Sequence, residues 1–150
     1  MDILKNGVNL FFRVNEFITS STSLFIFSPY IKLDTLKELV DNSTALKSVF
    51  VRWESKDLIL GSSDLEIYPY LKSKGVSLFR NPRLHLKAYV DNYKRCLITS
   101  ANISARALNT PAFQNYNYEL GVVIDTMSLE DRFYFEIIKN ESTLITDSVY

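Results

Sequence analysis

His85 and Lys87 are the two residues whose types and spacing best fit phosphate chemistry. The run Leu84–Val90 alternates as a strand does, so both polar side chains would point to one face, about 7 Å apart. A neutral imidazole is a nucleophile near pH 7, and an ammonium group can balance the charge of a phosphate oxygen. The pair therefore indicates phosphate chemistry, although a lone H-x-K pattern belongs more often to a histidine with a structural role.

Three further polar residues follow later in the chain. Ser100 and Asn102 come after a predicted strand and open a predicted helix over 100–108, where free backbone N–H groups attract anions; ordinary helix capping is the other explanation. Glu119 lies in a predicted apolar strand over 117–124, where an unpartnered carboxylate is unfavourable. A histidine N–H would be a suitable partner for it, and an exposed edge strand is the alternative.

The elements that must position these residues alternate early in the chain and cluster as strands later. Helical spacing and capping residues predict helices over 2–19, 34–40, 63–73, 100–108 and 128–138. Branched and aromatic runs predict strands over 23–28, 46–53, 76–79, 84–90, 95–99 and 117–124. This order indicates an α/β domain with a mixed central sheet flanked by helices on both faces.

Length and composition restrict the class of protein. The 150 residues fit a single domain over 1–150, and ten Phe and nine Tyr supply a core. The one cysteine, Cys96, excludes a disulfide scaffold and is expected in the core. No apolar run approaches the roughly 20 residues of a membrane span, and no leader pattern opens the chain. We therefore expect a cytoplasmic location, no stable membrane association, and, since no metal-ligand spacing occurs, no metal or cofactor.

Charge is distributed unevenly along the chain. The whole sequence is neutral, but residues 72–106 hold eight basic residues and one acidic residue, a net charge of +7, which leaves −7 for the rest. Such asymmetry favours an anion-binding side on an acidic body. Arg83 and Arg106 belong to this segment and are candidates for binding substrate phosphates, with solvated surface positions as the alternative.

Taken together, H-L-K-A-Y-V, T-S-A-N-I-S and N-Y-E-L-G-V resemble the phospholipase D superfamily with its histidine–lysine signature. The resemblance covers 63–124 best, and the run N-P-R-L-H-L-K-A-Y-V is similar to the branch with bacterial nucleases and restriction-endonuclease catalytic domains. It implies a phospholipase D-like domain with His85 as nucleophile or acid, and with Lys87 and Asn102 as phosphate ligands. It also implies that Glu119 orients His85.

Other positions either extend or depart from that pattern. The resemblance places Ser100 in the phosphate-binding turn, and Tyr89 shares the predicted face of His85, where it would line the site. The family often has an acid at the position of Asn92, and here Asp91 lies one residue earlier. In the family that acid is mainly structural. Thr99 replaces a glycine, which reduces backbone freedom.

The resemblance implies a metal-independent phosphodiesterase, and we expect a DNA endonuclease, with a restriction-type module as one form. His85 would form a phosphohistidine, while a second histidine would protonate the leaving group and then activate water. Because the chain has one histidine, we expect a homodimer that builds the site from two subunits. The chain has no room for a sequence-recognition domain, so any specificity would come from a separate domain or subunit.

Two other functions stay open. The same chemistry would serve a lipid phosphodiesterase or phosphatidyl transferase, although no basic amphipathic helix is evident. A non-catalytic nucleic-acid-binding module is the third possibility, against which the intact polar residues argue. The sequence does not distinguish DNA from RNA.

Overall fold

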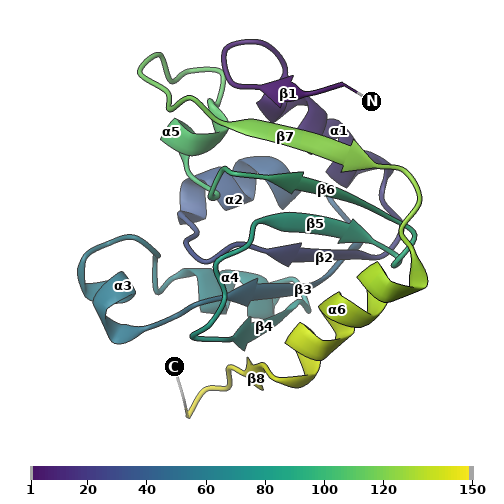
Figure 1. Cartoon of the computed structure of the whole chain (residues 1–150). Helices are drawn as coiled ribbons and strands as arrows, with labels where there is room; N and C mark the ends of the chain where they lie inside the picture. The colour runs from purple at the N-terminus through teal and green to yellow at the C-terminus, as the bar shows by residue number, and fades with distance from the viewer. Residues whose placement is uncertain (1, 149–150) are drawn as a thin grey trace.

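The computed structural model describes residues 2–148, whose strands form one eight-stranded mixed sheet (Figure 1). The spatial order of the strands is β1-β7-β6-β5-β2-β3-β4-β8. The strands are β1 (Leu4–Lys5), β2 (Leu24–Phe27), β3 (Leu46–Val51), β4 (Ser77–Arg80), β5 (Ala88–Asp91), β6 (Arg95–Thr99), β7 (Leu120–Ile124) and β8 (Thr143–Leu144). A mixed sheet in an α/β domain is thus confirmed.

Helices cover the two faces of this sheet unequally (Figure 1). Behind it lie α1 (Leu10–Ser20), α2 (Leu33–Val40) and α4 (Ile67–Ser73), and in front lies α6 (Leu129–Asn140). The larger core fills the space behind the sheet. A smaller core under α6 contains the stacked rings of Phe27, Phe50 and Phe79, together with Cys96. The flanked sheet and the buried cysteine agree with the sequence prediction.

On its front face, α6 leaves the β6–β7–β1 half of the sheet uncovered (Figure 1). Ile98 of β6 pairs with Val122 of β7 in the sheet, and the exposed fraction of Ile98 is 41%. The exposed fractions of Leu120 and Ile3 are both 55%. The four side chains line one shallow apolar hollow together with their neighbours. The front of the sheet is therefore apolar but only half buried.

The direction of the strands gathers many loops at one edge of the sheet. β2, β3 and β4 are parallel to one another, whereas β5 is antiparallel to β2, β6 to β5, and β7 to β6. Consequently the ends of β2, β3, β4 and β6 lie at the same edge as the beginnings of β5 and β7. We call this edge, with the loops at residues 28–32, 52–66, 81–87, 100–104 and 109–119, the site edge.

Two predicted helices begin later than the spacing indicated. Instead of a helix over 2–19, Leu4–Lys5 pairs with β7, and Gly7 takes a positive φ of 81° before α1 begins. The helix predicted over 63–73 begins at Ile67, with Pro69 in its first turn, where proline is tolerated. Ser63 is not its cap, because the Ser63 hydroxyl accepts the N–H of Ile31.

One more helix, α3 (Ser55–Ile59), and the short strand β8 were not predicted. α3 belongs to the loop after β3, where Arg52 makes paired hydrogen bonds to the buried carboxylate of Asp57. Asp57 caps α3 together with Glu54, and its carboxylate is buried because Arg52 balances its charge.

Candidate active site

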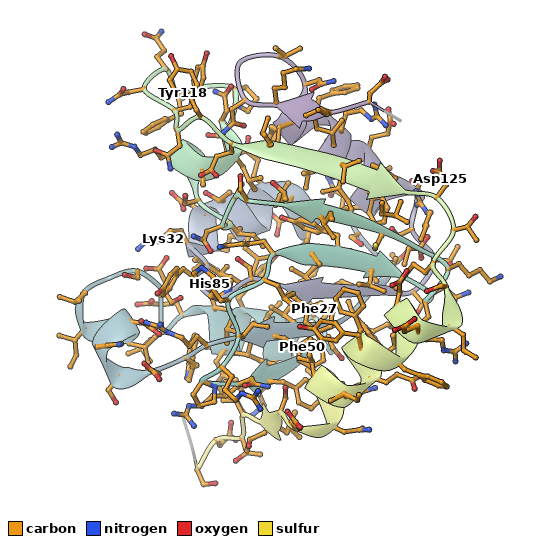
Figure 2. All side chains as sticks on the ribbon, viewed as in Figure 1. Phe27, Lys32, Phe50, His85, Tyr118 and Asp125 are labelled. Carbon is orange, nitrogen blue, oxygen red and sulfur yellow. The ribbon has the colours of Figure 1, made fainter. Side chains whose placement is uncertain are left out.

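His85 and Lys87 lie on the site edge, directly before β5 (Figure 2). The predicted strand over 84–90 is shorter in the structure and begins at Ala88, although the N–H of Thr99 still donates to the Lys87 carbonyl at 3.1 Å. Leu84 and Leu86 pack in the core under α6, as the alternation predicted. His85 is exposed and Lys87 is half-buried. Within residues 2–148, no hydrogen bond or ion pair engages either side chain, so both are available to a ligand.

The predicted partner of Glu119 is wrong in this structure. Its carboxylate accepts the Ser100 hydroxyl at 2.6 Å and the Asn117 side-chain amide at 3.2 Å, and it does not contact His85 through a hydrogen bond. Residue 119 precedes β7, so its carboxylate lies beside the turn that follows β6. Sequence reasoning missed Asn117, although its i, i+2 spacing to Glu119 was a usable signal.

The turn at 100–104 also differs from the predicted helix start. The helix α5 covers only Ala105–Leu108, and its cap is Ser104, whose hydroxyl accepts the Ala107 N–H. Ser100 instead bridges to β7, because its hydroxyl donates to Glu119 and accepts the N–H of Leu120. The prediction that Ser100 and Asn102 lie at a helix N-terminus is therefore wrong, although both lie on the site edge.

Asn102 is the most informative residue of this turn. Its side-chain oxygen is buried, and no donor among the described residues reaches it. A buried amide oxygen without a donor is unfavourable by about 1–3 kcal/mol. A protonated group or a ligand that donates a hydrogen bond at this point would remove that cost.

Tyr89 does not line the site. It is 1% exposed, packs in the core behind the sheet, and burial raises the pKa of its hydroxyl. By strand alternation Tyr89 lies on the same face of the sheet as Lys87, but α1 and α2 cover that face (Figure 1). Its proposed contact with substrate is therefore corrected to a core position.

Asp91 has the structural role that the resemblance assigned to the acid of the family. Its carboxylate accepts the N–H groups of Thr22 and Ser23 and pairs with Arg95 at 3.0 Å. Although burial acts to raise its pKa, these hydrogen bonds and the guanidinium lower it overall. The shift by one residue, with Asn92 in the turn that follows, does not remove the interaction.

The basic residues of 72–106 do not all face one way. Arg83, with an 85% exposed side chain, and Arg106 lie at the site edge. Lys94 and Arg95 lie at the opposite edge, in the β5–β6 hairpin, and Lys72 pairs with Asp147. The expected continuous basic side is thus only partly present, because the hairpin reverses the chain in the middle of the segment.

Cavities adjoin the histidine on the front of the sheet. One of about 460 Å³ is lined by His85, Lys87, Ser100, Ile98 and Tyr134 among others. A neighbouring cavity of about 300 Å³ lies between the loop that carries His85 and α6. Tyr134 was not singled out from the sequence, where it read only as part of a helix.

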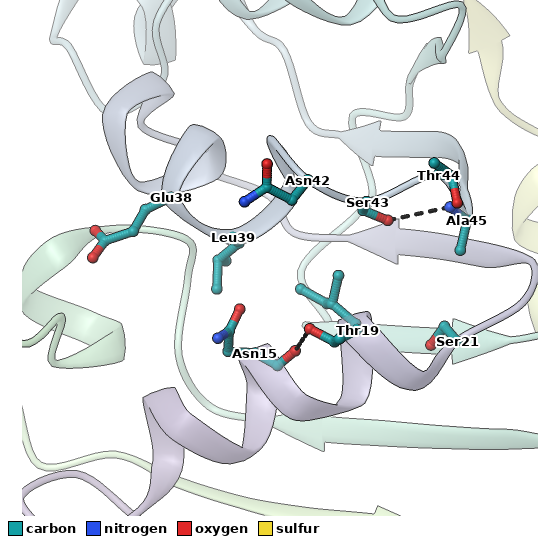
Figure 3. Close-up of a pocket in the computed structure, with 10 residues that line it drawn as sticks. Asn15, Thr19, Ser21, Glu38, Leu39, Asn42, Ser43, Thr44 and Ala45 are labelled. Carbon is teal, nitrogen blue, oxygen red and sulfur yellow. Dashed lines mark hydrogen bonds between the residues drawn. The ribbon is translucent and has the colours of Figure 1, made fainter.

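A third cavity, of about 360 Å³, lies between α1 and the end of α2 (Figure 3). Its one charged lining residue is Glu38, whose carboxylate points away from the other labelled side chains. None of the predicted site residues lines it. Among residues 2–148, no three His, Cys, Asp or Glu side chains gather as metal ligands, and no helix in that range is long and apolar enough to cross a membrane.

Comparison with known proteins now decides the family. The family model described as "Cardiolipin synthase, PLD-like domain" matches residues 14–137. The chain belongs to the phospholipase D superfamily. This superfamily is one of phosphodiesterases, so membership makes the chain a phospholipase D-like enzyme. No curated protein sequence matches it.

Solved structures share the fold at low sequence identity. NucT from Helicobacter pylori aligns with a TM-score of 0.74 at 13% identity, covering 96% of this chain and 98% of that one. Nuc from Salmonella typhimurium, a phospholipase D family member, aligns with a TM-score of 0.69 at 16% identity, covering 97% and 99%. A phosphatidylserine synthase from Haemophilus influenzae aligns with a TM-score of 0.68 at 18% identity, but only 36% of its chain is covered. The fold is thus that of the small phospholipase D-like proteins.

Proposed function

We propose that this phospholipase D-like enzyme is a metal-independent nuclease that cleaves DNA through a phosphohistidine, at a site shared by two subunits. The observation that supports this most directly is the unengaged His85 and Lys87 pair, which lines one cavity with Ser100 on the same edge of the sheet. The similarity of fold to Nuc and NucT, which extends over nearly all of each chain, supports a nuclease.

The proposed reaction has two displacements. An imidazole nitrogen of His85 attacks phosphorus, the bond to the leaving oxygen breaks, and the histidine of the second subunit protonates that oxygen. That second histidine then takes a proton from water, and the hydroxide displaces His85 from phosphorus. The ammonium group of Lys87 and the side-chain amide N–H of Asn102 donate to the non-bridging oxygens. We assign Glu119 the role of holding the Ser100 turn, because its carboxylate accepts the Ser100 hydroxyl.

Two exposed apolar surfaces support the presence of a second subunit. One is the uncovered sheet half with Ile98 and Leu120. The other is the outward stripe of α6, where Phe133, Tyr134 and Ile137 are 51%, 58% and 54% exposed. In a two-fold dimer, each α6 would cover the partner's bare sheet, so both surfaces are buried together. His85 lines the cavities between these surfaces, so in such a dimer it would face the partner.

The decisive test is cleavage of labelled single- and double-stranded DNA in excess EDTA, by the native chain and by His85→Ala. We expect cleavage that survives EDTA and falls at least about a thousandfold in the variant, since the nucleophile is lost. Quenching with denaturant at alkaline pH, where the P–N bond survives, should trap labelled DNA on the native chain only. Full activity of His85→Ala would overturn the proposal.

A lipid phosphodiesterase or phosphatidyl transferase is the second candidate, because the matching family model takes its name from cardiolipin synthase. Incubating the native chain and His85→Ala with phosphatidylglycerol vesicles tests this second function. Turnover of lipid and none of DNA would favour this second function, and binding of DNA without turnover of either substrate would favour a binding module.

A further inference from the structure

Tyr118 is exposed to an extreme degree for an aromatic residue. Its exposed fraction is 97%, so its ring packs on almost nothing within residues 2–148. It stands on the site edge, one residue before Glu119, and it projects from the loop above α5 (Figure 2). Large aromatic rings are usually buried at least in part, because burial removes apolar surface from water. An ordered ring in this position is therefore a candidate for contact with a ligand.

The backbone around Tyr118 is held firmly by its neighbours. The N–H of Asn117 donates to the Arg106 carbonyl at 2.9 Å, and the Asn117 carbonyl accepts the Asn6 side-chain amide at 2.9 Å. Glu119 is held by Asn117 and Ser100. Because the residues on both sides are fixed, the ring has little backbone entropy to lose when it binds.

A cation lies beside the same backbone. The Arg106 side chain donates from Nε to the Asn117 side-chain oxygen at 2.8 Å, and no partner within residues 2–148 occupies its terminal nitrogens. Asn117 thus connects a planar aromatic ring and an exposed guanidinium. A nucleotide unit of a single strand offers the matching pair, a base with a free face and a phosphate.

The distance from Arg106 and Tyr118 to the candidate catalytic pair suits one nucleic-acid strand that contacts both. β7 is two strands away from β5, and neighbouring strands are about 4.8 Å apart, so the beginnings of β5 and β7 are separated by about 10 Å. We propose that Arg106 and Tyr118 form a binding site for one nucleotide of a single-stranded polynucleotide, with its base stacked on Tyr118. The inference rests on the proposed nuclease function and adds strand preference to it.

Binding to the inactive His85→Ala chain tests the inference without turnover. Fluorescence anisotropy is measured with labelled oligothymidylate, with an abasic strand of the same length, and with a duplex hairpin. Adding Tyr118→Ala should weaken oligothymidylate binding about tenfold, the range of one stacked base, and leave the abasic strand and duplex unchanged. Tyr118→Phe should keep the affinity, because stacking needs no hydroxyl. Arg106→Ala should weaken oligothymidylate and abasic strand alike, because it binds phosphate.

Phe12→Ala is the matched control, since Phe12 is also an exposed aromatic residue, at 66%, but lies on α1 outside the site-edge loops. It should change none of the three affinities. Equal losses on base-containing and abasic strands in Tyr118→Ala, or no loss at all, would overturn the stacking site while leaving the nuclease proposal intact. Absence of binding to every nucleic acid would instead overturn the proposed function, and this inference with it.

Discussion

Asp91 joins the end of β5 to the start of β2 through one carboxylate. It accepts two backbone N–H groups, from Thr22 and Ser23, and contacts Arg95 at the opposite end of the strand from His85 and Lys87. Its side chain is only 9% exposed, so water cannot replace these partners. The register of the strand that begins just after Lys87 therefore depends on this carboxylate.

We predict that Asp91→Asn lowers the free energy of unfolding by about 3 kcal/mol at pH 7, because Arg95 and the two N–H groups lose their charged partner. The pKa of Asp91 is lowered by folding, so the stabilisation is present above the unfolded pKa near 4 and is lost as the pH falls below it. Urea titrations at pH 7 and pH 3 measure both effects. The variant should lose less stability than the native chain on acidification, while Asp125→Asn, an exposed control on the same edge, should behave as native.

Residue types were the most predictable part of the site, and their partners the least. His85 and Lys87 were found from their chemistry and spacing, and alternation placed Leu84 and Leu86 in the core. The hydrogen bond from Ser100 to Glu119 was not predictable, because it joins two strand ends whose register is fixed only by the sheet. Tyr89 was misjudged because alternation gives the face of a residue but not what covers that face.

α6 shows an element whose limits follow from local signals. Ser128 accepts the Asp131 N–H at 3.1 Å, and Asp131 accepts the Ser128 N–H at 3.2 Å, so a capping box opens the helix. Strong caps mark a boundary in the sequence itself. By contrast, tertiary structure delays the start of α1 and α5. α1 begins at Leu10, after β1 and Gly7 with its positive φ, and α5 begins at Ala105, after the bridge from Ile31 to Ile103.

We predict that Ser128→Ala lowers the free energy of unfolding by about 1 kcal/mol, because the first turn of α6 loses its side-chain acceptor. Thermal unfolding followed by circular dichroism measures the change. Ser128→Asp should keep native stability, since Asp is an equally good cap. An unchanged melting temperature in Ser128→Ala would mean that packing of Phe135 alone fixes the helix.

For the molecule as a whole, two bare apolar surfaces and a single histidine make the monomer incomplete for the proposed chemistry. If each site needs His85 from both subunits, a mixed dimer of native and His85→Ala chains is inactive. After subunit exchange at equal amounts, activity should fall to about one quarter of that of the native chains at the same total concentration, against about one half for independent sites. Light scattering supplies the control: Leu120→Arg should be monomeric and inactive while keeping its fold by circular dichroism.

The edge of the sheet opposite the site offers surface turns for insertions. Its connections at 21–23, 41–45, 74–76 and 91–94 are short, and they hold none of the candidate catalytic or phosphate-binding residues. In the β5–β6 hairpin, Asn92 and Tyr93 both take positive φ at the centre of the turn that the Lys94 N–H closes on the Asp91 carbonyl. Surface turns of this kind are where chains accept insertions most readily. A recognition module grafted there would leave the reacting edge free, so new target preferences can be added to this scaffold without redesigning its chemistry.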